Sequence, residues 1–122
     1  MKEDNRMIHR MNLNLQPFTM IRSGQKTIEL RLNDEKRQQI KANDEMEFSC
    51  TDSKQAPFTV RVIKLHFFKT FAELYASLPL LKCGYTSENI SDANPDDMNK
   101  YYSAEEQSKY GVVGIEFELI QE

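Results

Sequence analysis

The sequence predicts an α+β fold that is mainly β: a partly closed β-barrel of about five to six strands, with short helices at its periphery. Four segments alternate apolar and polar residues with the period of two that is typical of half-buried strands, and a fifth is a β-branched and aromatic run. The stretches between these segments leave room for short helices only. A chain of 122 residues fits one domain with a single core.

The first elements are a strand, a short helix and a second strand. Met11, Leu13 and Leu15 alternate with asparagines, which predicts a strand. Pro17 suits a first helical position and Gly24 suits a helix C-terminal cap, so a helix is expected over 17–23. Alternation then returns over 28–32, with apolar residues on one face and polar residues on the other.

The middle of the chain predicts a helical turn and two more strands. A turn capped by Asn33 or Asp34 is expected to run through Ile40, and alternation over 46–50 predicts the third strand. A polar loop follows. The β-branched and aromatic run over 58–68 predicts a long fourth strand, able to bend across a barrel.

The C-terminal half predicts one helix, an irregular segment and the last strand. Thr70-x-x-Glu73 is the pattern of a capping box and opens a helix that stops near Pro79. The acidic stretch over 82–109 predicts loops and short helical turns, with a second capping box at Ser103-x-x-Glu106. Alternation over 113–119 predicts the final strand.

Composition and charge narrow the class of protein. No apolar run is long enough to span a bilayer and the N-terminus lacks a signal-peptide pattern, so a cytoplasmic protein without membrane contact is expected. Cys50 and Cys83 stand apart, which predicts neither a disulfide scaffold nor a metal site, and nothing predicts a cofactor. Residues 1–43 hold nine Lys/Arg against five Asp/Glu, a charge of +4, whereas residues 44–122 hold seven against fourteen, a charge of −7. Basic residues therefore concentrate near the N-terminus.

Three charged residues of the second strand form the strongest candidate site. Glu29 and Arg31 are two apart, so they project from one face and can converge on one ligand. The arginine fork suits a phosphate or a base edge, and the carboxylate accepts from amino groups. Lys26 joins them only if the strand begins after it or the turn at Gly24 swings it inward. The alternative is a solvated strand face with ordinary cross-strand pairs.

Other candidates have simpler structural interpretations. His66 is expected to be a strand residue rather than a base, and Glu73 a cap rather than a catalytic acid. His9 has no nearby ligand pattern. The five tyrosines could stack on bases, although most tyrosines simply pack. They are Tyr75, Tyr85, Tyr101, Tyr102 and Tyr110.

The stretch SGQKTIELR fits the pattern G-x-K-x-x-E-x-R of the ASCH domain, the activating-signal-cointegrator homology family. Gly24, Lys26, Glu29 and Arg31 stand at its four fixed positions. The resemblance extends upstream through LNLQPFTMIRSG and downstream through LNDEKRQQIKANDEMEF, and YGVVGIEFELI is similar to the family's last strand. Residues 51–110 carry no recognised motif. The chain most resembles the small single-domain bacterial members.

The resemblance implies a PUA-like fold over residues 9–122, after a tail of residues 1–8, and RNA as the partner. The motif residues Lys26, Glu29 and Arg31 would line a cleft and contact RNA or a nucleotide-like ligand. Basic residues of the same third of the chain would extend this footprint: Arg22, Lys36, Arg37 and Lys41.

Two other functions remain open. Some small bacterial members hydrolyse acylated cytidine with a motif lysine and a threonine, and Glu29 stands at the threonine position, which weighs against that activity here. Lys26 and Glu29 could still act as an acid–base pair on another modified nucleoside. Alternatively, the acidic stretch from Glu88 to Glu106 could contact a basic partner in transcription or translation regulation. The sequence predicts no oligomeric state.

Overall fold

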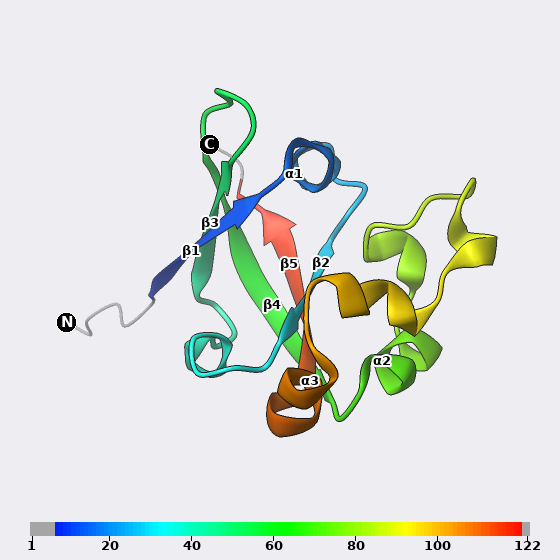
Figure 1. Ribbon diagram of the computed structural model, residues 1–122. Helices are drawn as coiled ribbons and strands as arrows, with labels where there is room; N and C mark the ends of the chain where they lie inside the picture. Colours follow the sequence, from blue (N-terminus) through cyan, green and yellow to red (C-terminus); the bar gives the residue numbers. More distant parts are fainter. Residues whose placement is uncertain (1–6, 121–122) are drawn as a thin grey trace.

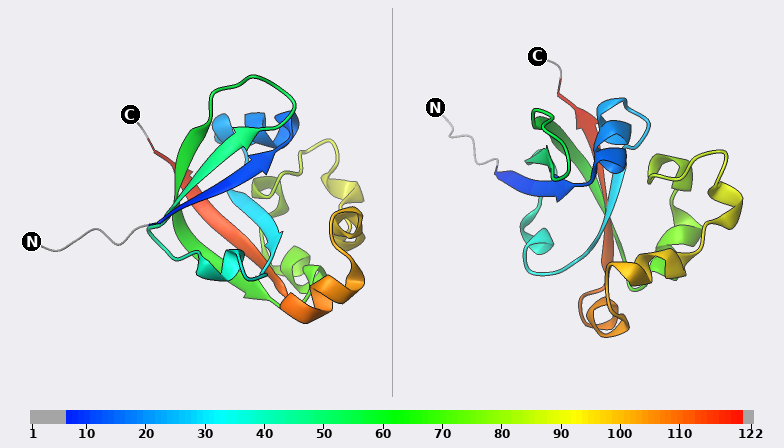
Figure 2. Two further views of the ribbon diagram at one scale, coloured as in Figure 1. Left: turned by 60° about the vertical axis from the view of Figure 1, so that its left-hand side comes forward. Right: turned by 45° about the horizontal axis from the view of Figure 1, so that its top comes forward.

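A computed structural model describes residues 7–120, in which five strands form one mixed sheet curled into a half-barrel (Figure 1). The strand order is β1-β3-β4-β5-β2; β1 pairs with β3 in parallel and all other pairs are antiparallel. The strands are β1 (Ile8–Leu13), β2 (Ile28–Leu32), β3 (Glu45–Cys50), β4 (Phe58–Phe68) and β5 (Val112–Leu119). Their curvature is visible in two further views (Figure 2).

Short helices occupy the connections. The α-helices are α1 (Leu15–Arg22), α2 (Phe71–Ser77) and α3 (Ala104–Tyr110), and the 3-10 turns are η1 (Arg37–Gln39), η2 (Leu80–Lys82), η3 (Ile90–Asp92) and η4 (Pro95–Lys100). The long segment between β4 and β5, which holds α2 to α3, gathers on the β2 side of the half-barrel (Figure 1, Figure 2). Among residues 7–120, no helix is long and apolar enough to cross a membrane.

The predicted fold class is confirmed, with small corrections at element boundaries. The first strand spans Ile8–Leu13 rather than 11–15, because Asn14 is the N-cap of α1 and Leu15 is already helical. Gly24 follows the end of α1 with φ +88°, a conformation that favours glycine. The predicted tail falls mostly on residues outside the described range.

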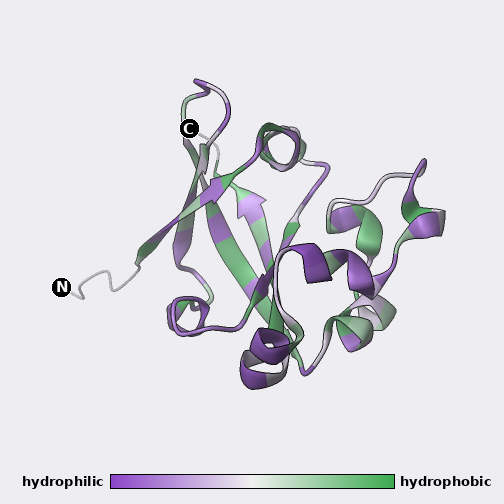
Figure 3. Cartoon of the chain, viewed as in Figure 1, coloured by the Kyte–Doolittle hydropathy of each residue, from purple (hydrophilic) through white to green (hydrophobic). Residues whose placement is uncertain are grey.

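Two hydrophobic clusters fill opposite faces of the sheet. The first lies inside the half-barrel, where Phe48, Val60 and Ile115 are completely buried. The second lies outside it, between β2 and α2, and includes Phe71 and Leu74. Hydrophobic residues accordingly concentrate on the strands and α2, while α3 is mostly hydrophilic (Figure 3). The second cluster attaches the long β4–β5 segment to β2.

The register of β2 against β5 determines which way the charged motif points. Glu29 lies opposite Ile115 and Arg31 opposite Val113, and directly opposed residues share a face of an antiparallel pair. Ile115 and Val113 belong to the inner cluster. Glu29 and Arg31 therefore face the interior side of the half-barrel, while the apolar residues of β2 face α2.

The segment before β5 is held by side-chain caps. Ser103 accepts from the Glu106 backbone N–H at 3.1 Å, and the Glu106 carboxylate accepts from the Ser103 backbone N–H at 3.1 Å, so the predicted capping box is present. At Thr70 only half of the predicted box forms: its hydroxyl accepts from the Glu73 backbone. Asn94 and Asp97 form a third box at the start of η4.

We expect Ser103→Ala to lower the free energy of unfolding by about 1 kcal/mol, because it leaves the first turn of α3 without its cap. Urea denaturation measures the change. Ser108→Ala, on the exposed face of the same helix, should change stability much less. Equal effects of the two substitutions would contradict the role of the cap.

Candidate functional site

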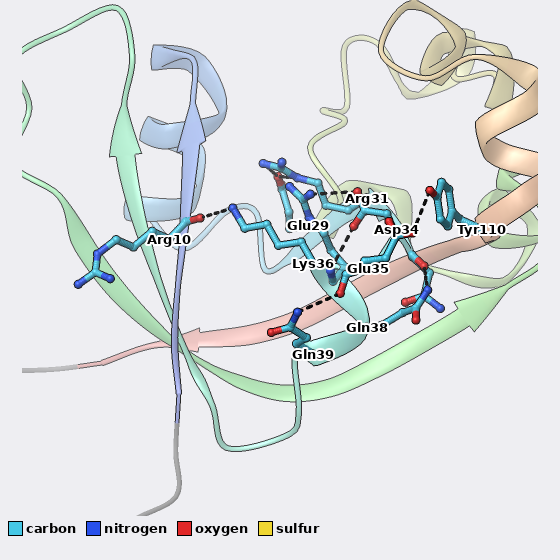
Figure 4. Close-up of polar contacts among 11 residues, drawn as sticks. Arg10, Glu29, Arg31, Asp34, Glu35, Lys36, Gln38, Gln39 and Tyr110 are labelled. Carbon is cyan, nitrogen blue, oxygen red and sulfur yellow. Dashed lines mark hydrogen bonds and ion pairs between the residues drawn. The ribbon is translucent and has the colours of Figure 1, made fainter.

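Lys26, Glu29 and Arg31 form a compact ionic triad. Lys26 Nζ lies 2.7 Å from Glu29 Oε1, and Arg31 Nη2 and Nε lie 2.7 Å and 2.8 Å from Glu29 Oε2. The side chain of Glu29 is 5% exposed and that of Arg31 is 16% exposed. The interpretation as a solvated strand face is therefore wrong. Glu29 and Arg31 are seen from the side of η1 in Figure 4.

Lys26 reaches Glu29 because β2 begins after it. The backbone N–H groups of Gln25 and Lys26 both donate to the Met20 carbonyl, which folds the chain back against α1 after Gly24. Thr27 N–H then donates to the Lys82 carbonyl, and regular pairing starts at Ile28. Strict alternation therefore does not apply at Lys26, and the turn points its side chain toward Glu29.

Gly84 covers the Lys26 side chain from the opposite segment. A Cβ atom at Gly84 would lie 3.6–3.8 Å from the end of Lys26, an ordinary van der Waals distance, and it is the φ of Gly84, +116°, that favours glycine. The neighbouring Cys83 is buried, and burial raises the pKa of its thiol to about 11. Cys83 is thus a neutral packing residue beside the triad.

The charges of the triad stabilise one another. Burial by itself would raise the pKa of Glu29, but the charges of Lys26 and Arg31 and their hydrogen bonds outweigh it and lower that pKa. Burial would likewise lower the pKa of Arg31, and the Glu29 carboxylate reverses this and raises it. Glu29 is thus ionised at neutral pH, and with Lys26 and Arg31 charged the triad carries a net positive charge.

The triad lies in a cleft of about 490 Å³. One wall comes from the end of β1 and from α1 with its N-cap, including Asn12, Asn14 and Met20. The other wall comes from α2 and from the segment between α2 and α3. Its lining residues are Tyr75, Cys83, Gly84, Tyr85, Asn89, Asp97, Met98, Lys100, Tyr101 and Tyr102. Parts of the chain that are distant in sequence therefore meet around the motif.

Tyrosines dominate the second wall. The Tyr75 hydroxyl lies 2.7 Å from the Tyr85 hydroxyl, which donates to Asp97 Oδ2 at 2.7 Å. Burial raises the pKa of Tyr75 and Tyr85, and the hydrogen bond from Tyr85 helps to lower the pKa of Asp97. Tyr101 stands at the rim, 62% exposed. Asp97 was not identified from the sequence, where its only local signal is its place three residues after Asn94, the N-cap of η4.

The other predicted basic residues do not line the cleft. Arg22 is exposed and contacts the Ala56 carbonyl and the Phe58 ring. Lys36 donates to the Arg10 carbonyl across the open side of the half-barrel (Figure 4), and Arg37 pairs with Asp34. Lys41 is exposed beyond η1. A role of these residues in binding stays a prediction.

The remaining candidates have structural roles. His66 is a strand residue, as predicted, and its Nε2 lies 2.9 Å from Glu116. His9 is buried in β1 with its Nε2 2.9 Å from Asp44, which links the starts of β1 and β3. Glu73 contributes its backbone N–H to the cap of α2. Between Met7 and Ile120, no group of three His, Cys, Asp or Glu side chains could hold a metal ion.

Comparisons with known proteins agree with the fold. Among solved structures, the chain is similar to the hypothetical protein PH0355, with 32% identity, a TM-score of 0.76 and coverage of 93% of this chain and 100% of that one. It is also similar to protein PF0455 from Pyrococcus furiosus, with 29% identity, a TM-score of 0.73 and coverage of 95% and 100%. No curated protein sequence matched significantly.

More distant structures share the fold alone. The ASCH protein from Zymomonas mobilis is 12% identical, with a TM-score of 0.64, and the match covers 96% of this chain and 69% of that one. The family model of the ASCH domain matches residues 11–121, which include the motif, both cleft walls and all of β2–β5. The chain belongs to the ASCH domain family.

Proposed function

We propose that this ASCH domain binds single-stranded RNA and holds one nucleotide in the cleft. The observation that carries the proposal is the buried Lys26–Glu29–Arg31 triad at the base of a tyrosine-lined cleft. Family membership supports it, because the triad consists of the motif residues that the resemblance assigns to the ligand. The alternatives are an enzyme and a protein-interaction module.

The charge of the cleft favours an anionic ligand. Lys26, Arg31 and Lys100 line it against Glu29 and Asp97, which leaves one net positive charge if all five are ionised. Arg31 uses Nε and Nη2 on Glu29, so Nη1 remains for a ligand, and the Lys26 ammonium has hydrogens beyond the one directed at Glu29. These donors suit a phosphate oxygen or an acceptor on a base edge.

The size and the aromatic content of the cleft also suit a nucleotide. A volume of about 490 Å³ falls in the range of roughly 300–1,000 Å³ that is usual for small-ligand clefts. Tyr101, on the rim, is mostly exposed; the Lys100 ammonium lies over its ring, 5.2 Å from the centroid, and a base would stack on the opposite face. Stacking tolerates any base, so this contact would contribute affinity more than sequence preference.

The state of Glu29 weighs against acid–base catalysis by the Lys26–Glu29 pair. Both carboxylate oxygens are held by cations, and the lowered pKa leaves Glu29 without a proton to give at neutral pH and makes it a weak base. Incubation with acylated nucleosides tests the alternative directly. Turnover that disappears in Lys26→Ala would support an enzyme acting on a modified nucleoside in place of an RNA-binding domain.

Arg31→Ala is expected to weaken binding of a short single-stranded RNA by about 1–3 kcal/mol, because it removes the Nη1 donor and a positive charge from the cleft. Fluorescence anisotropy at fixed salt measures the affinity. Arg31→Lys keeps the charge beside Glu29 and should also lose affinity, since an ammonium does not have the planar geometry that holds Glu29 with two donors and presents a third to the ligand. Thermal unfolding of each variant establishes that it is folded.

Two exposed cations outside the cleft are matched controls. Lys41→Ala is expected to reduce the salt dependence of binding more than the affinity, as a diffuse phosphate contact would. Arg10→Ala removes a 74% exposed side chain and should have little effect. Equal RNA affinity of the wild type and the folded Arg31 variants would refute the site. The interaction module would be favoured if RNA binding stayed at background level and a protein were captured from lysate even after nuclease treatment.

A further inference from the structure

The wall opposite the triad contains a hydroxyl chain, formed by Tyr75, Tyr85 and Asp97, that the RNA proposal does not use. Its two links, Tyr75 Oη to Tyr85 Oη and Tyr85 Oη to Asp97 Oδ2, are both 2.7 Å long. All three residues line the cleft. The chain joins α2, the turn after η2 and the start of η4, so it also holds this wall together.

The direction of the hydrogen bonds is determined at Asp97. Its Oδ2 accepts from the Asn94 backbone N–H at 3.2 Å as well as from Tyr85, and an ionised carboxylate can only accept. The bond from Tyr85 and then that from Asn94 keep the pKa of Asp97 below its ordinary value, so the carboxylate is ionised at neutral pH. Tyr85 therefore gives its single proton to Asp97, and its oxygen must accept from Tyr75.

The same count of hydroxyl protons and lone pairs determines what Tyr75 can offer a ligand. Its one hydroxyl proton is directed at Tyr85, so its oxygen can offer a ligand only lone pairs. On the floor of the cleft the opposite holds, because Lys26 and Arg31 can only donate and both Glu29 oxygens are already paired with these two cations. The cleft thus has hydrogen-bond donors at its base and an acceptor on the α2 wall.

We propose that Tyr75 is a specificity-determining residue that selects bases carrying an exocyclic amino group over the same ring with a carbonyl in its place. This inference rests on the proposed function, since it requires a base to enter the cleft. An amino group donates to the Tyr75 oxygen. A carbonyl there would place two acceptors against each other and leave both without a proton, which costs more than the loss of one hydrogen bond.

The test uses labelled single-stranded oligonucleotides in two matched pairs: oligo(A) against oligo(I), and oligo(C) against oligo(U). Within each pair an amino group is exchanged for a carbonyl on the same ring, and the adjacent ring nitrogen changes from an acceptor to an N–H donor. The wild type should bind the amino member about tenfold more tightly in both pairs. Tyr75→Phe removes the acceptor and should reduce the preference to about twofold or less.

Tyr85→Phe tests the inference more sharply than Tyr75→Phe, because it changes the direction in which Tyr75 can donate. It removes the acceptor of the Tyr75 proton, so that Tyr75 becomes free to donate to a carbonyl and the preference should disappear or reverse. Tyr110→Phe is the matched control, because its hydroxyl donates to Glu35 (Figure 4) and Tyr110 is not among the residues that line the cleft. This control should keep the tenfold preference. All three substitutions retain the ring and its packing.

The mean affinity and the ratio within a pair separate the two proposals. Binding that depends on Arg31 but shows no amino preference overturns the inference and leaves RNA binding intact. A preference that survives in both Tyr75→Phe and Tyr85→Phe also overturns it. If no oligonucleotide binds the wild type, both proposals fail.

Discussion

Glu29→Gln is expected to lower the free energy of unfolding by about 3–5 kcal/mol. The substitution keeps the shape of the side chain but removes the negative charge between Lys26 and Arg31, whose nitrogens lie 2.7 Å from its two oxygens. Two cations would then remain close together in a mostly buried site, with one amide between them. Denaturation by guanidinium chloride, with several spectroscopic probes, measures the change.

The control is Glu73→Gln, which alters an exposed carboxylate in the first turn of α2. Its backbone N–H still caps the helix, so we expect a change within about 0.5 kcal/mol. A loss of similar size in both variants would mean that the triad does not contribute specifically to stability. A gain in stability for Glu29→Gln would show that desolvation of the three charges outweighs their attraction.

The stability difference between the wild type and Glu29→Gln is expected to depend on pH. The pKa of Glu29 is lowered in the folded state, so the unfolded chain binds a proton at Glu29 more readily. The stabilisation by its charge is complete above the unfolded pKa of about 4.3 and is lost as the pH falls through the lower folded value. The stability difference between the wild type and Glu29→Gln should therefore shrink below about pH 4. Other carboxylates titrate in both proteins and cancel.

Phe71→Ala is the second substitution with a large expected effect, a loss of about 3–5 kcal/mol. Phe71 is 2% exposed, opens α2 and stacks on Tyr102 with ring centroids 6.1 Å apart. Its truncation leaves a cavity in the outer cluster, which attaches the tyrosine wall to β2. We therefore expect weaker RNA binding as well, without any change to a residue that lines the cleft.

Phe67→Ala is the matched control for this substitution. Phe67 is 59% exposed on β4, so its truncation removes little buried area and should change stability by less than about 1 kcal/mol. Thermal denaturation of both variants measures the change in stability, and the anisotropy assay then measures the change in RNA affinity. If Phe71→Ala loses stability but keeps full RNA affinity, the outer cluster does not position the wall.

The sequence by itself was sufficient for the fold class and for the approximate positions of the strands. Period-two alternation in β2, β3 and β5 identifies strands because a half-buried strand must place every second residue in the core. Caps such as Ser103 are recognisable because the chain within four residues supplies both partners. The convergence of Glu29 and Arg31 follows from the same local geometry, since two residues two apart share a strand face.

Only the tertiary structure decided what surrounds that face. The sequence left a solvated face as an alternative, and burial of Glu29 depends on the register of β2 with β5, whose partners lie about 85 residues away along the chain. The inclusion of Lys26 depends on a turn anchored to α1 and η2, and the tyrosine wall with Asp97 depends on the outer cluster. These features arise from contacts between distant segments, which no local pattern of residues encodes.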